Sequence, residues 1–427
     1  MGAAHRRHNI RVSTIPTKME IPRTIRMMRR IHQTWLWKTM RDYCPEGAWD
    51  WAKQKAYGIA AYRRTRSFVA RSERRYRNDA RFDLGNVSRG FAPRRARTND
   101  DDHDLLERIC TAYDKASSAQ ARAGIVYAPS PWWQRMQERG LTNVRRALAE
   151  NDLSSLREMY RNFFRDPCST GLIEQSYSRI AAQSDHPIPI IRQRFLIADA
   201  LQRLDYWRKL TEDRFALTSL AGPEAGNPFG VEVEGLLVRT GAEYQHYCAH
   251  RVAGLLDAPD GTVAEIGGGY GGMAYYLLRD FPKVKYIDFD VPESLALTAY
   301  YLSKALPQLR LLLYGEGDAI NQHDVILLPA CMLRHASPES VDIVFSSQTM
   351  ALLTPEARAE YLRDIVRISR KHFLCIGHGD KIHDSMRKED GSLSVLENNA
   401  SAWNYHCSVY PDEFECLYGV EAKHQKR

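Results

Sequence analysis

The sequence predicts an α/β protein in which a doubly wound parallel sheet follows a helical domain. Three observations lead to this prediction. An apolar strand runs into a glycine-rich turn at residues 263–272, strand and helix patterns alternate after that turn, and apolar residues recur at helical spacing before it. The chain has 427 residues, 44% of them hydrophobic and 26% charged, which is ordinary globular composition with room for more than one domain.

The glycine-rich turn holds five glycines in residues 267–272, where only Tyr270 carries a side chain. Glycine adopts positive φ without strain and lets a ligand approach the backbone, and the helix that follows offers unpaired N–H groups. We therefore expect this turn to line a pocket for a nucleotide-like cofactor. Its expected cofactor-binding residues are Gly267, Gly268, Gly269, Tyr270 and Gly272.

Two acidic residues decide which cofactor the turn is expected to bind. Glu265 lies two residues before the first glycine, where a carboxylate would repel the pyrophosphate of a dinucleotide. The same carboxylate suits S-adenosylmethionine, whose sulfonium and ammonium groups are cationic. Asp290 ends the next strand, at the place where an acid accepts ribose hydroxyls in nucleotide-binding folds. We expect S-adenosylmethionine as the cofactor, with Tyr270 covering its methionine portion.

Several segments resemble the sugar O-methyltransferases found in antibiotic and surface-polysaccharide gene clusters. The resemblance extends from about residue 155 to about residue 380 and is carried by residues 160–166, 227–230, 244–256, 265–272, 290–293, 300–302 and 346–350. It implies a class I, Rossmann-like methyltransferase sheet and a sugar, glycoside or polysaccharide precursor as methyl acceptor. Thr349 stands where the family tends to have Glu, so no acid–base role is carried over to that position.

Ahead of the sheet, the sequence predicts a helical cap or substrate domain over residues 101–240. An acidic cluster at 99–104 marks its start. Apolar residues recur at helical spacing in 105–122, 142–166 and 190–211. Aromatic residues at such spacing usually pack in a core, so we expect core positions rather than a sugar-binding platform for four of them. These are Tyr160, Phe163, Phe164 and Trp207.

The methyltransferase domain is expected over residues 241–427. Its predicted strands are 263–267, 284–289, 309–314, 341–346 and 372–376, and its predicted helices are 241–256, 271–280, 293–306 and 355–370. The apolar segment 325–329 competes with 309–314 for the third strand of the sheet. Two weaker segments, 404–410 and 416–422, could form an antiparallel hairpin that closes it.

Reacting groups should follow the carboxyl ends of the strands, because ligands of open α/β sheets bind there. We expect Ser346 and Gln348 at the cofactor and His378, Asp380 and His383 at the catalytic centre. Methyl transfer to an alcohol needs a base, and a histidine that titrates near neutral pH suits this role. His378 is the first candidate, with Asp380 as the group that orients its imidazole.

The same loop allows a second interpretation. His378, Asp380, His383 and Asp384 together resemble the ligands of a divalent metal ion, but no spacing rule makes the pattern specific. We therefore expect no required metal.

The first 100 residues form a basic arm that carries 24 Lys and Arg against 8 Asp and Glu, whereas the rest of the chain carries 36 against 44. Such an arm fits a solvated and flexible tail, a contact with another subunit of a homo-oligomer, or attraction to a polyanion. Residues 22–40 have a basic amphipathic pattern, and arginines alternate with aromatic residues between 62 and 97, as on nucleic-acid surfaces. Charge alone leaves these alternatives open.

Eight cysteines without any C-x-x-C pair predict reduced thiols and neither a zinc site nor a disulfide framework. The sequence lacks an apolar run of transmembrane length and a signal-peptide core, so a cytoplasmic location is expected. The alternatives to a sugar O-methyltransferase are an NAD-dependent oxidoreductase, a methyltransferase guided to nucleic acid by the basic arm, and a binding module without activity.

Overall fold

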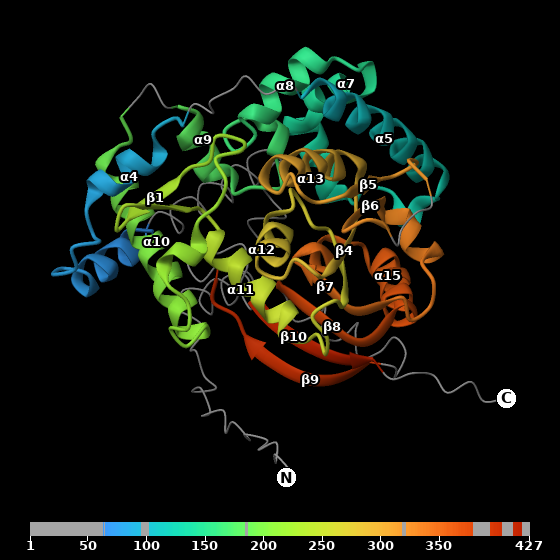
Figure 1. Ribbon diagram of the computed structural model, residues 1–427. Helices are drawn as coiled ribbons and strands as arrows, with labels where there is room; N and C mark the ends of the chain where they lie inside the picture. The colour runs from blue at the N-terminus through green and yellow to red at the C-terminus, as the bar shows by residue number, and fades with distance from the viewer. Residues whose placement is uncertain are drawn as a thin grey trace, which may run out of the picture. The chain divides into compact units, whose positions relative to one another are not determined.

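The computed structural model describes residues 63, 65–94, 102–183, 187–317, 322–378, 393–403 and 413–420. The chain divides into a unit of residues Met1–Arg66 and a compact unit of residues Ser67–Arg427, and the second of these carries the fold (Figure 1). The amphipathic helix predicted at 22–40 lies outside the described residues.

An eight-stranded sheet with the order β5-β6-β4-β3-β7-β8-β10-β9 forms the centre of this unit. Strands β3 to β8 are parallel to one another, and β10 is antiparallel to both β8 and β9. Their bounds are β3 Thr262–Ile266, β4 Lys285–Asp290, β5 Leu311–Leu313, β6 Val325–Pro329, β7 Val341–Ser347, β8 Ser369–His378, β9 Leu393–Ala400 and β10 Glu413–Val420. The predicted doubly wound, Rossmann-like fold is confirmed. The winding reverses at β3, whose carboxyl end is therefore the expected ligand-binding edge.

Helices cover both faces of the sheet because successive side chains of each strand point to opposite sides. Val263 belongs to the core cluster on the side of α11 (Ala242–Ala253), α12 (Gly272–Asp280) and α13 (Pro292–Ala305). Ala264 and Ile266 belong to the cluster on the side of α15 (Pro355–Ile368). Figure 1 shows these helices against the sheet.

The structure decides two questions about strands, the identity of the third strand and the composition of the antiparallel hairpin. Both candidates for the third strand are strands, since β6 pairs with β4 and β5 pairs with β6 at the edge. An antiparallel hairpin is present as β9 and β10, and β10 overlaps the predicted second segment 416–422. The predicted first segment, 404–410, lies outside the described residues. The outer side of β9 is largely exposed, so its sequence carries no core pattern that could have revealed it.

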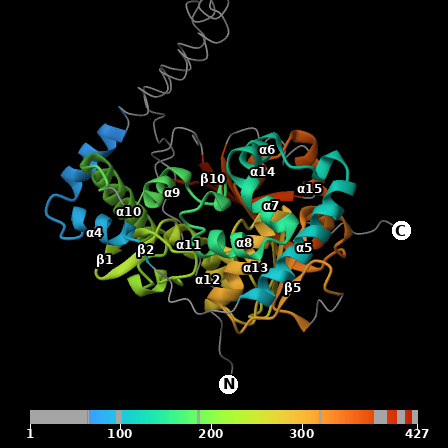
Figure 2. The same ribbon diagram turned by 90° about the horizontal axis from the view of Figure 1, so that it is seen from above.

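The helical cap contains α5 (His103–Arg122), α6 (Pro131–Met136), α7 (Thr142–Glu150), α8 (Leu153–Arg161), α9 (Gln175–Ala182) and α10 (Ile190–Leu210). The segment 142–166, where apolar residues recur at helical spacing, holds two helices, because Asn151 takes a left-handed conformation with φ of 55° and ends α7. A hairpin of β1 (Gly230–Val233) and β2 (Leu236–Arg239) was not predicted. Figure 2 shows α5, α7 and α8 beside α13.

The cap is joined to the sheet domain by aromatic packing. Tyr160 packs on Tyr300 of α13, and Phe163 packs on Tyr270 and Tyr301. The prediction that the cap aromatics are core residues is confirmed, since all four are at most 2% exposed. They are Tyr160, Phe163, Phe164 and Trp207.

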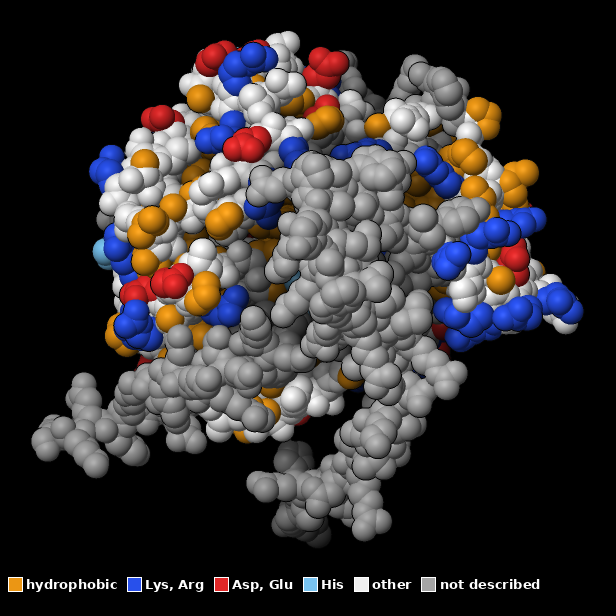
Figure 3. All heavy atoms as spheres, turned by 180° about the vertical axis from the view of Figure 1, so that it is seen from behind, with side chains coloured by type: hydrophobic (Ala, Val, Ile, Leu, Met, Phe, Trp, Pro, Cys, Tyr) orange, Lys and Arg blue, Asp and Glu red, His pale blue; other side chains and the backbone are white. Residues whose placement is uncertain are grey.

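Residues 67–94 differ from the expected basic arm, because they belong to the compact unit and include α4 (Leu84–Phe91). Three of the aromatic residues that alternate with arginines are buried here: Phe68, Tyr76 and Phe91 are 2–4% exposed. Arg74, Arg75 and Arg77 stay exposed. Figure 3 shows Lys and Arg side chains gathered at one edge of the molecule. The alternation therefore reflects an amphipathic segment and not a set of stacking rings for bases.

None of the helices in the described part of the chain has the length and hydropathy needed to span a lipid bilayer.

Candidate functional site

The glycine turn lies between β3 and α12, at the edge where the sheet reverses its winding. Gly267, Gly269 and Gly271 have φ values of +78°, +67° and +84°, which favour glycine strongly. A Cβ atom on Gly267 would lie 2.1 Å from Thr349 Oγ1, and one on Gly268 would lie 2.7 Å from Asp288 Oδ2. Backbone conformation and close packing by other parts of the chain together explain these glycines.

The N–H groups of the turn are already engaged by carboxylates of the chain. Gly268 N donates to Asp288 Oδ1 at 3.0 Å, and Gly269 N donates to Asp290 Oδ2 at 2.9 Å. Asp290 Oδ1 also accepts from Val291 N at 2.7 Å. In a dinucleotide-binding fold the pyrophosphate lies beside this turn, at the N-terminus of the helix that follows it. An anionic ligand placed there would meet two acidic side chains that already accept from N–H groups of the turn.

Three buried carboxyl groups surround the turn. Glu265 is 3% exposed and accepts from the Tyr286 hydroxyl at 2.5 Å. Burial raises the pKa of Glu265 to about 8 and that of Asp290 to about 7, and it raises the pKa of Asp288 well above its usual range. Asp288 Oδ2 has no hydrogen-bond partner among the described residues. A cation beside these groups would stabilise their charged forms.

Asp288 was missed by the sequence analysis. Its position in the middle of an apolar strand gave a signal, because a fully buried acid needs a partner. The sequence could not identify that partner as Gly268 N, since 20 residues separate the two.

Tyr270 points away from the turn into the packing between the cap and the sheet domain. Its hydroxyl receives hydrogen bonds from Arg239 and from Gln245 Nε2, the latter at 2.8 Å, and its ring is 4% exposed. Gln245 also lies where a Cβ atom on Gly272 would be, 2.3 Å away. The contacts of Tyr270 give it a role in fixing the turn, and its expected role at the cofactor stays a prediction.

The cap contacts the turn at Leu172 and the neighbouring start of α13 at Glu293. Leu172 Cδ2 lies 3.9 Å from the Cβ position of Gly269. Glu293, the second residue of α13, is 6% exposed and accepts from Trp133 Nε1 at 2.8 Å and from Gln137 Nε2 at 2.6 Å. Residues of the cap therefore border the expected cofactor site.

The loop after β7 contains the two other residues expected at the cofactor. Ser346 is fully buried, and its Oγ donates to the carbonyl of Ile266 at 3.2 Å, so it joins β7 to β3. Gln348 has a left-handed backbone with φ of 63°, and its side chain faces β8 and β10 instead of the glycine turn. These contacts place Gln348 beside His378, the candidate base.

His378 ends β8, and its Nδ1 lies 2.8 Å from Gln348 Oε1. Gln348 Nε2 donates to Glu413 Oε1 at 3.1 Å. Burial lowers the pKa of His378, so the ring is neutral near pH 7. Asp380 and His383, like Asp384, lie outside the described residues. Glu413 was missed because only the pairing of β10 with β8 brings it beside His378.

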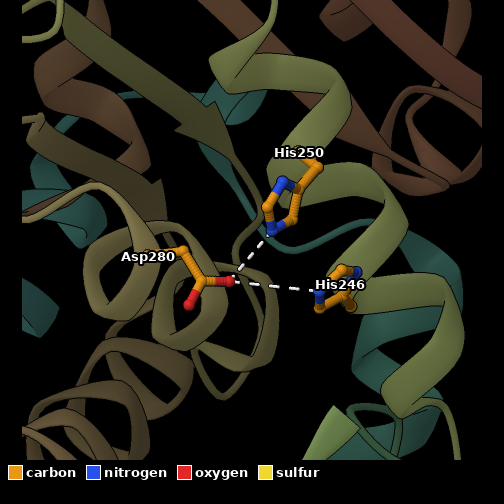
Figure 4. A group of neighbouring side chains, drawn as sticks. All are labelled: His246, His250 and Asp280. Carbon is orange, nitrogen blue, oxygen red and sulfur yellow. Dashed lines mark hydrogen bonds and ion pairs between the residues drawn. The ribbon is translucent and has the colours of Figure 1, made fainter. Parts of the chain in front are cut away.

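The described residues contain one grouping of side chains with the composition of a metal site: His246, His250 and Asp280, whose ligand atoms lie within 4.8 Å of one another (Figure 4). The two histidines are four residues apart on α11 and Asp280 ends α12. His250 Nε2 lies 2.9 Å from Asp280 Oδ2, and His246 Nε2 lies 4.0 Å from it. The i, i+4 spacing of the histidines was the signal in the sequence.

The second nitrogen of His246 argues against a metal ion in this cluster. A histidine that binds metal donates its other N–H to an acceptor, but His246 Nδ1 faces the Trp207 indole N–H at 3.2 Å, which can only donate. Nε2 must then carry the proton in the neutral ring. Arg279 also pairs with Asp280, with Nε at 2.7 Å from Oδ1. The cluster fits a contact that holds α11 to α12 better than a metal site.

No family model matches this chain, and a search of curated proteins gave no match. Solved structures to which the chain shows similarity include magnesium protoporphyrin IX methyltransferase from Synechocystis PCC 6803 with bound S-adenosylmethionine, at 10% identity and a TM-score of 0.32, over 51% of this chain and 91% of that one. The pyocyanin biosynthetic protein PhzM matches at 16% identity and a TM-score of 0.30, over 57% and 68%. A TehB-like methyltransferase from Corynebacterium glutamicum matches at 12% identity and a TM-score of 0.30, over 53% and 99%. Similarity at this level adds nothing on activity.

Proposed function

We propose that the chain is an S-adenosylmethionine-dependent O-methyltransferase that acts on a hydroxyl group of a sugar or glycoside. The observation that carries the proposal is the set of buried carboxyl groups at the glycine turn. Glu265, Asp288 and Asp290 all have pKa values raised by burial, and two of them cap the N–H groups of the turn. Such a site attracts a cation and disfavours a pyrophosphate.

Within this proposal, Glu265 lies near the cationic methionine portion of the cofactor and Asp290 accepts its ribose hydroxyls. When bound, the cofactor supplies a methyl group on a positively charged sulfur. His378 holds the proton of the acceptor hydroxyl at Nε2 as that oxygen becomes the nucleophile. Glycine residues of the turn allow the cofactor to approach the backbone closely. The cap residues that border the site, Leu172 and Trp133, would limit the access of water.

The choice of a sugar hydroxyl rests on the family resemblance of residues 155–380. The oxidoreductase alternative is disfavoured because Asp288 and Asp290 occupy two N–H groups of the turn and place acidic side chains where a pyrophosphate would lie. The nucleic-acid alternative is disfavoured because three of the aromatic residues that would stack on bases, Phe68, Tyr76 and Phe91, are buried. Calorimetry with S-adenosylmethionine and with NAD tests the choice of cofactor, and tighter binding of NAD would overturn the proposal.

Replacing His378 with Ala is expected to lower methyl transfer by about 100-fold or more, which is typical of the loss of a general base. Affinity for S-adenosylmethionine should stay nearly unchanged, because His378 contacts Gln348 and not the glycine turn. The measurement is mass spectrometry of sugar acceptors incubated with the protein and the methyl donor, in which a product gains one methyl group.

The matched control is His372→Ala, six residues earlier on the same strand β8 and paired with Gly419 of β10. This variant should retain methyl transfer. Normal turnover by His378→Ala would show that another group is the base.

A further inference from the structure

We infer that Glu413 and Gln348 are positioning residues that fix which nitrogen of His378 carries the proton, leaving Nε2 as the nitrogen with the lone pair. The inference rests on the proposed function only where it gives Nε2 a role in methyl transfer. The direction of each hydrogen bond in this group follows from the residues present and does not depend on the proposed function.

The series of hydrogen bonds starts at Glu413, which is 6% exposed and begins β10. As a carboxylate it can only accept hydrogen bonds. It receives one from Gln348 Nε2 at 3.1 Å and one from Ser401 Oγ at 3.0 Å. The amide of Gln348 must therefore turn its NH₂ group toward Glu413 and its oxygen toward His378.

Gln348 Oε1 can only accept, so His378 Nδ1, 2.8 Å away, must donate. A neutral imidazole carries one proton, and that proton is then on Nδ1. Because burial lowers the pKa of His378, the neutral ring is the main form near pH 7. Nε2 is the basic nitrogen in this form, which is the state that a general base requires.

The backbone holds all three residues in place. Glu413 and His378 are direct partners in the antiparallel pairing of β10 and β8. Gln348 lies between them in a left-handed conformation with φ of 63°, held by the hydrogen bond from its N–H to the carbonyl of Ile376 at 2.7 Å. A non-glycine residue in this conformation is strained and needs support from its surroundings. The strained residue Gln348 carries the side chain that joins Glu413 to the candidate base His378.

The test is the tautomer of His378 in solution, read from ring ¹⁵N shifts of histidine-labelled full-length protein. The signal is assigned among the 14 histidines by its loss in His378→Asn. We expect the Nδ1–H form in the wild type. In Glu413→Gln the partner can donate, the amide of Gln348 is free to turn over, and the Nε2–H form should become a major or the main species. Gln348→Leu removes the acceptor and should have the same effect.

Glu415→Gln is the matched control, because Glu415 lies two residues further along β10 and is 7% exposed. It contacts the Tyr247 hydroxyl at 2.7 Å and Arg251 Nε at 3.0 Å instead of Gln348. Its substitution should leave the tautomer of His378 unchanged. A wild-type protein in the Nε2–H form, or a Glu413→Gln variant that keeps the wild-type tautomer, overturns the inference.

Activity measurements separate this inference from the proposed function. If the protein transfers methyl groups, Glu413→Gln should lower kcat by about tenfold or more with little change in KM, since the residue acts through the base. An unchanged kcat would remove Glu413 from that role. If no acceptor is methylated while the tautomers behave as expected, the proposed function fails and the positioning of His378 stands.

Discussion

Replacing Glu265 with Gln is expected to weaken the binding of S-adenosylmethionine by about 100-fold or more and to stabilise the unliganded protein at pH 8. The affinity should fall because a neutral amide cannot pair with the cationic end of the cofactor, and loss of a buried charge pair costs about 3–5 kcal/mol. Isothermal titration calorimetry measures the first effect. The Tyr286 hydroxyl can still donate to an amide oxygen, so the fold should be retained.

The effect on stability follows from the pKa of Glu265, which burial raises from 4.5 to about 8. The folded protein binds the proton more tightly than the unfolded chain, so this group stabilises the fold below pH 4.5, and that contribution is lost as the pH rises to 8. The loss is about 1.4 kcal/mol for each pH unit in this window. Thermal unfolding should therefore give Glu265→Gln the higher Tm at pH 8, and the difference should shrink toward pH 5. A variant that is less stable than the wild type at pH 8 would contradict the burial of an uncompensated acid here.

The same pKa predicts that cofactor binding releases a proton below pH 8. Affinity in the wild type should then rise with pH from 6 to 8, by up to about tenfold for each unit per proton released. Calorimetry in two buffers with different ionisation enthalpies counts the protons. An affinity that does not change with pH would exclude Glu265 from contact with the cationic group.

Gly267→Ala is the second substitution with a large expected effect, a loss of about 3 kcal/mol in the free energy of unfolding. Two costs add here. A left-handed backbone costs a residue with a Cβ atom about 1–2 kcal/mol, and overpacking costs about 1–3 kcal/mol. The new Cβ atom would lie 2.1 Å from Thr349 Oγ1 at a φ of +78°. Urea unfolding of the unliganded protein measures the loss.

Gly241→Ala separates the two costs. Gly241 has a φ of +85° and no atom within 4 Å of its Cβ position, so this variant should lose only about 1–2 kcal/mol. Equal losses in the two variants would show that the loop at Thr349 moves away from the turn at no cost. The proposed packing of that loop on Gly267 would then be wrong.

Much of the fold was predicted from the sequence because its signals are local. Apolar strands followed by amphipathic helices gave β3, β4, β7, β8, α11, α12, α13 and α15 within a few residues of their observed bounds. The failures share a physical cause. Asn151 divides a helical pattern by a backbone conformation that apolar spacing does not encode, and β9 is exposed enough to lack a strand pattern.

The candidate site divides in a similar way. The glycine turn, Glu265 and Asp290 form a local signature, with residue types and spacing that the chemistry of the cofactor requires. Asp288, Glu413 and the role of Gln348 escaped prediction because each depends on a partner far along the chain.

By itself the sequence determined the class of fold, the location of the turn and the acidic character of the region around it, since periodicity and spacing act over a few residues. Tertiary structure alone decided where each buried polar group finds its partner. It directed the carboxylates of β4 to the N–H groups of the turn and placed Tyr270 in the packing against the cap. It also brought β10 beside β8, so that an acid 35 residues from His378 orients the imidazole through an amide from a third strand end. Burial makes such pairing obligatory, but the register that achieves it is a property of the whole fold.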